Sequence, residues 1–304
     1  MVNHDDFLDI SDYSREELLH SLDEADRIKK DLKAGRGCDV LAGKTLAMVF
    51  QKPSMRTRIS FEVGMYQLGG YALYLAPADI GLGKRESVAD IARVLARYND
   101  GVMARVFAHD DVLQLAQFSD VPVINGLSDL LHPCQLMADL LTVREHKGRV
   151  EGLKVAFIGD GNNLCNSWLN AAFRLDFTLS IAIPEGYEPD REILERATAA
   201  NPDISVTQSP SEAVEEADVI YTDTWTSMGQ EEESAKRRED FAGFTVNEEL
   251  VSRAAADVIV MHCLPAHRGE EITDEVIDGP HSVVFDEAEN RLHAQKAILV
   301  ELMG

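Results

Sequence analysis

Strand-like apolar segments and amphipathic helix-like segments alternate along the whole of this 304-residue chain. Such alternation is typical of an α/β protein, in which helices connect the parallel strands of a sheet. The pattern breaks once, at Lys147-Gly148, where a predicted helix ends in a glycine that can cap it. We therefore expect two doubly wound parallel-sheet domains, 1–148 and 149–286, with a cleft between them where ligands bind. A last amphipathic helix, 287–304, is expected to return to the first domain.

The expected elements follow from this alternation. Ser14 and Glu17 form a capping box that opens a first helix, which ends near Ala34. Residues 230–243 are charged and irregular, so we predict a loop there. The predicted strands are 44–50, 71–75, 101–106, 121–124, 153–158, 178–183, 204–207, 218–221, 257–261 and 282–285. The further predicted helices are 55–69, 87–98, 109–118, 133–147, 163–174, 190–200, 211–216, 247–254 and 287–303.

The stretch Lys52-Pro53-Ser54-Met55-Arg56-Thr57-Arg58 joins the end of a predicted strand to the start of a helix. A helix N-terminus favours anions, because its first N–H groups lack partners and its dipole is positive there. The serine and threonine add hydroxyl groups, and the two arginines add forked donors that fit phosphate oxygens. The sequence therefore predicts a phosphate site. The structural alternative is an ordinary helix start flanked by arginines.

The overall charge limits the partners of this chain. Acidic residues number 53 and basic residues 29, which gives a net charge of −24. A polyanionic surface argues against nucleic acid or an acidic membrane as a partner. The acid excess and the scarcity of lysine indicate a protein of a salt-rich cytoplasm, because molar salt screens self-repulsion. An ordinary acidic surface is the alternative.

Neither a membrane span nor a disulfide framework is expected. No apolar run approaches the roughly 18 residues that a span needs, and the acidic start of the chain lacks the pattern of a signal peptide. Four cysteines, which lie far apart, have no paired spacing: Cys38, Cys134, Cys165 and Cys263. Free thiols in a reducing cytosol are the default for such cysteines, so we expect a cytoplasmic protein.

Polar residues at two further strand ends of the first half are candidate ligands of a substrate. His132 and Gln135 flank Pro133 at a predicted helix start, so they lie at its positive end. His132 can donate to a carbonyl oxygen, and Gln135 can bind an amide. Arg105 ends a predicted strand, and the carboxyl ends of parallel strands face the ligand crevice. Each residue alone is also compatible with a structural role.

In the second half, Gly159-Asp160-Gly161-Asn162-Asn163 follows a strand and opens a helix. It is half of a dinucleotide fingerprint, but the third glycine is replaced by Leu164, so a nicotinamide site is weakly supported. The two asparagines instead offer neutral hydrogen bonds that suit a carboxylate or an amine. A tight strand-to-helix turn is the structural alternative.

The segment after the strand 218–221 carries Asp223, which can bind an ammonium group, and Ser227, whose surroundings can bind a carboxylate. Simple capping is the alternative here.

The segment His262-Cys263-Leu264-Pro265-Ala266-His267 allows three interpretations. A metal site is possible, although the second ligand pair of structural zinc sites is lacking. A nucleophilic Cys263 with a histidine base is the second. The third, which the rest of the chain favours, is a cysteine that lines a substrate pocket. Arg291, in the last helix, can close the anion site or can be a solvated helix charge.

Six segments in this order resemble the aspartate/ornithine carbamoyltransferase family, and within it the ornithine-specific members. They are Ser-x-Arg-Thr-Arg at 54–58, His-Pro-x-Gln at 132–135, Gly-Asp-Gly-Asn-Asn at 159–163, Asp-x-x-x-Ser-Met-Gly at 223–229, His-Cys-Leu-Pro at 262–265 and Glu-Asn-Arg-Leu-His at 289–293. The resemblance spans essentially the whole chain. It implies a carbamoyl-phosphate domain, an ornithine domain, a homotrimer, no cofactor and no metal.

The resemblance also implies a role for each matching residue. Those that hold the phosphate of carbamoyl phosphate are Ser54, Met55 through its N–H group, Arg56, Thr57 and Arg58. Those around its carbamoyl group are Arg105, His132, Gln135, the Leu264 carbonyl and Arg291. Those that bind L-ornithine are Asn163, Asp223, Ser227, Met228 and Cys263. Among these, Arg105, His132 and Cys263 are the implied catalytic residues.

Two departures from the family pattern bear on these roles. Met55 stands where the family usually has threonine, which removes one hydroxyl group. Gly81 stands where the family often has a glutamine that reaches a neighbouring subunit, and Lys84 is a candidate replacement for it. Other acceptors also remain open: aspartate, putrescine or an N-acylated ornithine. A non-catalytic dinucleotide or metabolite sensor would leave the arginine-rich helix start unexplained.

Overall fold

The computed structural model describes residues 5–83, 85–226 and 231–304 of the chain. Its elements are η1 (Ile10–Asp12), α1 (Arg15–Lys33), β1 (Thr45–Phe50), α2 (Met55–Gln67), β2 (Tyr71–Leu75), α3 (Pro77–Ile80), α4 (Val88–Tyr98), β3 (Gly101–Arg105), α5 (His109–Phe118), β4 (Val123–Leu127), α6 (Pro133–Lys147), β5 (Lys154–Ile158), α7 (Asn163–Arg174), β6 (Thr178–Ala182), α8 (Arg191–Ala200), β7 (Ile204–Thr207), α9 (Pro210–Ala213), β8 (Val219–Thr222), η2 (Glu231–Glu233), α10 (Ser234–Asp240), α11 (Glu248–Val251), β9 (Ile259–His262), α12 (Asp274–Ile277) and α13 (Val284–Met303).

The chain divides into two compact units. The first unit is Met1–Leu141 together with Glu289–Gly304, and the second unit is Thr142–Ala288. The boundaries between them fall inside α6 and α13. Each unit holds one parallel sheet, so the predicted α/β class is confirmed. The most C-terminal part of the chain belongs to the first unit, as the sequence predicted for the last helix.

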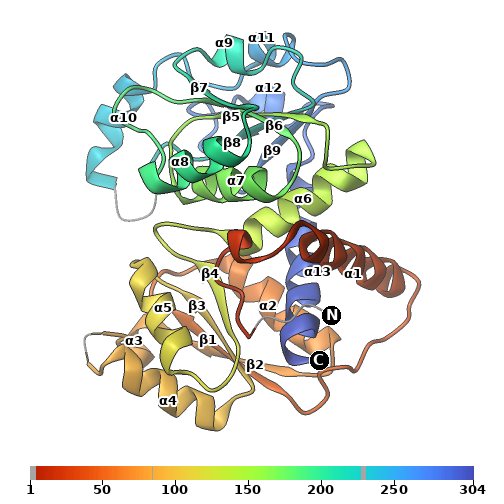
Figure 1. The fold of residues 1–304 in the computed structure, drawn as a ribbon, viewed down its shortest axis with the longest axis vertical. Coiled ribbons are helices and arrows are strands. Elements are labelled where there is room, and N and C mark those ends of the chain that lie inside the picture. Colours follow the sequence, from red (N-terminus) through yellow and green to blue (C-terminus); the bar gives the residue numbers. More distant parts are fainter. Residues whose placement is uncertain (1–4, 84, 227–230) are drawn as a thin grey trace. The chain divides into compact units, whose positions relative to one another are not determined.

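The sheet of the first unit has the strand order β2-β1-β3-β4. On one face of this sheet, Ala47 and Val49 of β1 belong to a core that includes Ile91 of α4 and Val112 of α5, the helices that cover this face (Figure 1). On the opposite face, α2 packs against α13, where Gly64 allows close approach of the Lys296 side chain. This division follows from the two-residue period of a strand, which turns neighbouring side chains to opposite faces.

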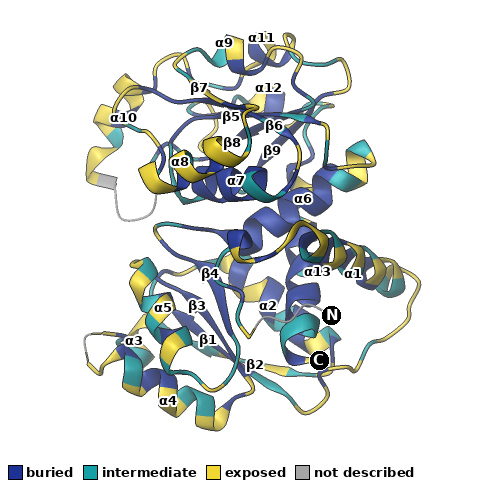
Figure 2. Cartoon of the chain, in the orientation of Figure 1, coloured by how far each residue is buried: buried dark blue, intermediate teal, exposed yellow. Residues whose placement is uncertain are grey.

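The sheet of the second unit has the order β7-β6-β5-β8-β9. One face carries a core that includes Ile158, Ile220 and Phe241, under the short helices α9 to α12. On the other face, Trp168 of α7 packs edge-on against Tyr221, at 5.4 Å between ring centroids. The inner strands of both sheets are buried (Figure 2), as parallel sheets covered on both faces require, whereas the edge strands β2 and β7 are partly exposed.

Both sheets reverse their strand order at one point, between β1 and β3 in the first and between β5 and β8 in the second. Loops at the carboxyl ends of such neighbouring strands diverge and leave a crevice, where ligands of open α/β sheets bind. Figure 1 shows these strands at the centre of each sheet. The fold therefore directs attention to the loops that follow β1, β3, β5 and β8.

Most predicted elements are confirmed, and β1 to β9 agree with the predicted strands within three residues at each end. The predicted strand 282–285 is wrong, because α13 begins at Val284 and Ser282 forms only an isolated bridge with Val260. The predicted loop 230–243 is wrong too, since η2 and α10 lie within it.

The capping box at Ser14 is confirmed: the Glu17 N–H donates to Ser14 Oγ at 3.3 Å, and the Ser14 N–H donates to Glu17 Oε2 at 2.8 Å. Across the described residues, no helix is both long enough and apolar enough to cross a membrane.

Candidate active site

The start of α2 has the geometry of an anion site. Ser54 is its N-cap in an extended conformation, and Ser54 Oγ accepts the Thr57 N–H at 3.3 Å. The Ser54 hydroxyl also donates to Thr57 Oγ1 at 3.1 Å, and Thr57 is fully buried. The side chain of Met55 is 68% exposed. Only its backbone N–H group is therefore suited to bind an anion at this helix end.

A neutral histidine lies among cations beside this helix start. His132 is buried, and this burial holds the pKa of its imidazole well below the usual value of 6.5. The positive charges of Arg291, Arg105, Arg56 and then Lys52 lower the pKa of His132 further. The fold thus gathers around one imidazole the cations of segments that are far apart in sequence. Such a group can bind a dianion and hold a carbonyl oxygen beside it.

Arg291 ties this group together. Its Nη1 donates to Gln135 Oε1 at 2.6 Å, and its Nη2 donates to Thr57 Oγ1 at 3.2 Å. The Gln135 Nε2 donates in turn to Asp139 Oδ1 at 2.8 Å. Both ends of the Gln135 amide are therefore held, so the orientation of this side chain is fixed before any substrate arrives.

Arg58 has a different environment from Arg56. It lies on the exposed side of α2, where its Nε donates to Glu62 Oε1 at 3.0 Å. Its guanidinium also stacks over the Tyr74 ring at 4.0 Å from the centroid. The structure therefore engages Arg58 with Glu62 of the same helix and with the Tyr74 ring of β2.

Lys52 is a residue of this site that the sequence did not single out. It is buried, and its Nζ lies 4.4 Å from the centroid of the Phe107 ring. Burial lowers the pKa of the Lys52 ammonium, and the charge of Arg105 lowers it further. Its position at the carboxyl end of β1, next to Pro53, is the signal that could have found it.

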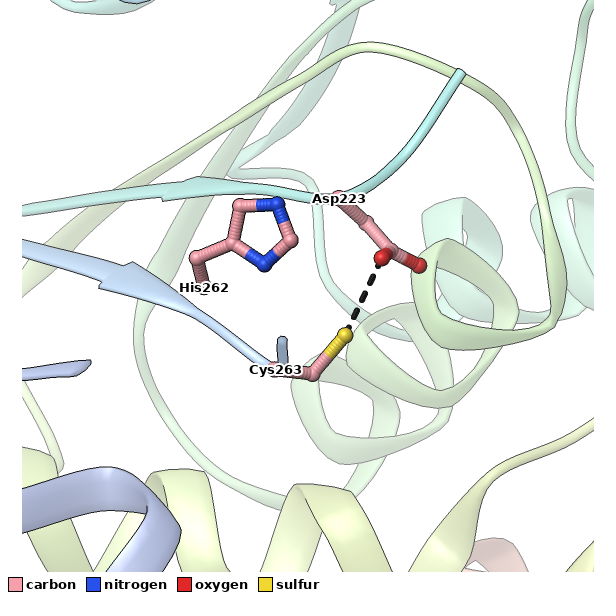
Figure 3. A group of neighbouring side chains, drawn as sticks. All are labelled: Asp223, His262 and Cys263. Atoms are coloured by element: carbon pink, nitrogen blue, oxygen red, sulfur yellow. Dashed lines mark hydrogen bonds between the residues drawn. The ribbon is translucent and has the colours of Figure 1, made fainter. Parts of the chain in front are cut away.

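In the second unit, Asp223 follows β8 and is held from two sides. The Cys263 thiol donates to Asp223 Oδ1 at 3.0 Å (Figure 3), and Asn162 Nδ2 donates to Asp223 Oδ2 at 2.8 Å. Asn162 comes from the turn after β5, the strand beside β8. The geometry thus brings together the aspartate, the cysteine and the asparagine turn that the sequence marked. A carboxylate fixed in this way can bind an ammonium group.

The turn Gly159–Asn163 serves the fold itself. Asn162 caps α7, since its Oδ1 accepts the N–H groups of Leu164 and Cys165 at 2.9 and 3.1 Å. Gly161 is needed for a close approach between chain segments: a Cβ there would lie less than 3.0 Å from the backbone of Tyr187–Pro189. That segment occupies the space in which a dinucleotide pyrophosphate approaches the second glycine of a fingerprint. The dinucleotide interpretation is therefore not supported.

His262 is a buried positioning group. The Leu264 N–H donates to His262 Nδ1 at 2.9 Å, so the ring proton is on Nε2, which lies 3.1 Å from Glu271 Oε1. Both ring nitrogens are thus engaged within the chain. Potential metal-ligand atoms of His262, Cys263 and Asp223 lie within 4.8 Å of one another (Figure 3). To bind all three, a metal ion would have to displace a hydrogen bond of His262 or the one between Cys263 and Asp223. The remaining residue of the metal interpretation, His267, has an exposed side chain.

Other predicted site residues stand as follows. Asn163 is the first residue of α7 and is partly exposed. Leu264 has a left-handed φ of 58° and a cis bond to Pro265, which the sequence did not predict. Gly81 is the left-handed C-cap of α3. Ser227, Met228 and Lys84 lie outside the described residues.

Two family models match the chain. Residues 5–145 match the model described as "Aspartate/ornithine carbamoyltransferase, carbamoyl-P binding domain". Residues 151–302 match "Aspartate/ornithine carbamoyltransferase, Asp/Orn binding domain".

Curated relatives agree with these models. An ornithine carbamoyltransferase of Thermococcus kodakarensis is 56% identical over 303 residues, which cover 98% of this chain and 96% of the relative. The chloroplastic ornithine carbamoyltransferase of Pisum sativum is 53% identical, over 98% of this chain and 80% of the relative.

Solved structures are similar over the same length. The ornithine carbamoyltransferase of Pyrococcus furiosus has a TM-score of 0.95 at 52% identity, covering 98% of this chain and 97% of that chain. The enzyme of the same name from Thermus thermophilus has a TM-score of 0.91 at 45% identity and covers all of both chains.

Proposed function

Because this chain belongs to the aspartate/ornithine carbamoyltransferase family, we propose that it transfers the carbamoyl group of carbamoyl phosphate to the δ-amine of L-ornithine, giving L-citrulline and phosphate. The observation that carries the proposal is the group of cations around the neutral imidazole of His132 in the first unit. It supports capture of a small dianion whose carbonyl oxygen can accept a hydrogen bond.

The first unit is assigned to carbamoyl phosphate. The start of α2 with its arginines is proposed to hold the phosphate, and the residues around His132 are proposed to hold the carbamoyl group. The full assignment within this unit is Ser54, Met55 (N–H), Arg56, Thr57 and Arg58 for the phosphate, and Arg105, His132, Gln135 and Arg291 for the carbamoyl group. The Leu264 carbonyl, which the resemblance adds, belongs to the second unit. The buried Thr57 and the oriented Gln135 amide support the assignment within the first unit.

The second unit is assigned to ornithine. Asp223, which the Cys263 thiol and Asn162 hold in place, is proposed to bind the α-ammonium group. Its negative charge favours a cationic amino acid and disfavours a dicarboxylate such as aspartate. The proposed set is completed by Asn163, Ser227, Met228 and Cys263.

The reaction needs the neutral δ-amine of ornithine as nucleophile. It attacks the carbamoyl carbon and gives a tetrahedral intermediate, which collapses with loss of phosphate. Arg105, His132 and Thr57 are proposed to stabilise the oxyanion, at about 3–4 kcal/mol for each well-placed donor. Because the free amine is protonated near neutrality, the rate should rise with pH. Holding the amine next to the carbamoyl carbon contributes further to the rate, because the two bound substrates react at a high effective concentration.

A homotrimer is part of this proposal. Apolar side chains remain exposed on one strip of α2 and on the edge strand β2: Met55, Ile59, Tyr66, Tyr71 and Leu73. An exposed apolar strip beside an open sheet edge is typical of a surface that another chain covers. Light scattering after size exclusion tests this, with a trimer or a multiple of it expected.

A citrulline assay with a panel of amines tests the function. With carbamoyl phosphate, L-ornithine is expected to give citrulline, whereas aspartate, putrescine and an N-acylated ornithine are expected to react poorly. A higher kcat/KM for any other amine would overturn the assignment of the acceptor. Failure of all four to react would overturn the proposed transfer itself.

A further inference from the structure

A buried arginine lies behind the proposed ornithine site. Arg237 is on α10, in the segment that the sequence described as a charged loop, yet it is only 6% exposed. A guanidinium group loses much hydration energy on burial, so its partners must compensate for that loss. Its contacts therefore indicate what it does.

Arg237 joins the ends of two neighbouring strands. Its Nη1 donates to Asp160 Oδ2 at 3.0 Å, in the turn after β5. The same nitrogen donates to the Trp225 carbonyl at 2.7 Å, in the segment after β8. These are the two segments that carry Asn162 and Asp223. One guanidinium thus fixes the distance between the turn and the aspartate.

The charge of Arg237 also matters at this place. Burial raises the pKa of Asp160 to about 6, and the negative charge of Asp223 raises it as well, whereas the Arg237 cation lowers it. Asp160 and Asp223 therefore repel each other in a poorly hydrated environment. Arg237 also pairs with Glu233, since its Nε donates to Glu233 Oε2 at 3.2 Å. Its cation therefore offsets the carboxylates of Asp160 and Glu233, whereas that of Asp223 is held by Asn162 and the Cys263 thiol.

The same helix holds the turn from its outer side. The guanidinium of Arg237 lies 4.9 Å from the centroid of the Tyr187 ring, and the Tyr187 hydroxyl donates to Asp240 Oδ2 at 2.6 Å. The Tyr187 carbonyl accepts the Gly161 N–H at 2.9 Å. Movement of α10 would therefore reach the Gly159–Asn163 turn by two routes.

We propose that Arg237 is a positioning residue for the amino-acid substrate: through Asp160 and the Trp225 carbonyl it keeps Asn162 hydrogen-bonded to Asp223, the carboxylate proposed to bind the α-amino group. This inference rests on the proposed function of the second unit. Arg237 is not proposed to touch a reacting atom, so it acts through the turn after β5 and the segment after β8. Its removal should weaken ornithine binding and leave the carbamoyl-phosphate site of the first unit unchanged.

The test compares Arg237→Met with Arg238→Met, its neighbour on α10. Arg238 is exposed and pairs with Glu270 at 2.9 Å, so its loss controls for the removal of one positive charge from the helix. A buried hydrogen bond to a charged group predicts a rise of about tenfold or more in KM for ornithine in Arg237→Met. Its KM for carbamoyl phosphate should change by less than about threefold, as should both constants of Arg238→Met.

These measurements distinguish a failure of the proposed function from a failure of the inference about Arg237. Citrulline formation by the wild-type enzyme shows first that the proposed function holds; its absence would end that proposal independently of Arg237. With an active wild type, an unchanged KM for ornithine in Arg237→Met overturns the inference. Equal losses toward both substrates also overturn it, since they indicate general damage to the fold. If Arg237→Met does not fold, Arg237→Lys replaces it: a KM increase for ornithine alone supports the inference, and unchanged constants overturn it.

Discussion

The guanidinium of Arg291 donates to the amide oxygen of Gln135 at 2.6 Å, although the two residues are 156 positions apart in the chain. The opposite end of that amide is held by Asp139. A side chain fixed at both ends does not need to reorganise when a substrate binds, and such preorganisation is a large part of what a polar site contributes to catalysis.

Arg291→Met should therefore weaken the carbamoyl-phosphate site in two ways. It removes a cation that faces His132, and it releases Gln135 and Thr57. We expect KM for carbamoyl phosphate to rise about tenfold or more, which corresponds to at least about 1.4 kcal/mol. Lys33→Met is the control, because Lys33 is an exposed cation that pairs with Glu289 at 3.2 Å. Equal kinetics of the two variants would contradict the role of Arg291.

Arg56 and Arg58 should differ in their contributions. The positive charge of Arg56 contributes to lowering the pKa of His132, whereas Arg58 is engaged with Glu62 and Tyr74. Arg56→Ala is expected to lower kcat/KM for carbamoyl phosphate by about 100-fold or more, and Arg58→Ala by roughly tenfold. Steady-state kinetics and inhibition by inorganic phosphate measure both effects. The reverse order would show that Arg58 turns toward the phosphate when it binds.

Cys263 should affect ornithine more than carbamoyl phosphate. Cys263→Ser keeps a donor for Asp223, but the shorter C–O bond and the harder atom alter the contact at 3.0 Å. KM for ornithine should rise several-fold, by roughly 1 kcal/mol, and further in Cys263→Ala, which has no donor. A large fall in kcat with unchanged KM would instead point to a direct chemical role of the thiol.

Buried histidines should make stability depend on pH. Burial and the charge of Lys296 lower the pKa of His293 to about 4, so the folded state keeps it neutral where the unfolded state binds a proton near pH 6.5. Stability from this residue is complete above pH 6.5 and is lost as pH falls toward 4, by up to about 1.4 kcal/mol per pH unit.

The measurement is urea unfolding at pH 7.5 and pH 5 for the wild type and His293→Gln. Asp160 and Glu301 act in the opposite direction, because burial raises their pKa values to about 6 and about 7. The difference between the two proteins isolates His293, and the variant should lose less stability on acidification. An identical loss in both would show that His293 does not carry the effect.

Salt should stabilise the enzyme and raise its activity. At a net charge of −24 the folded chain repels itself, and the screening length falls from about 10 Å in 0.1 M salt to about 3 Å in 1 M salt. The melting temperature and the rate of citrulline formation are both expected to increase from low to molar KCl. A protein indifferent to salt over this range would contradict adaptation to a salt-rich cytoplasm.

The sequence predicted the alternation of helices and strands well, because the spacing of apolar residues and the capping residues are features of each segment itself. It failed at α10, where Arg237 is held by tertiary contacts with Asp160 and Trp225 that no local pattern reveals. It also failed at Val284, since a short apolar run that starts a buried helix is indistinguishable from a buried strand.

The candidate site was predictable where a strand end coincides with a charged residue, as at Arg105 and Asp223. Lys52 was missed because its burial and its contact with Phe107 come from the packing of two strand ends. The contacts of Arg58 with Glu62 and Tyr74 were also not predictable, since the position of Arg58 in the helix allows its side chain to point toward the helix start or toward Glu62.

Gly161 has a consequence for how this protein can diverge. Every amino-acid change that a single base substitution makes in a glycine codon introduces a side chain, and the backbone of Tyr187–Pro189 leaves no room for one. The sequence of the turn after β5 is therefore constrained by a loop that comes more than twenty residues later, and a side chain at 161 requires that loop to move. Another residue at 161 is therefore expected only together with a displacement of the 187–189 backbone away from the turn.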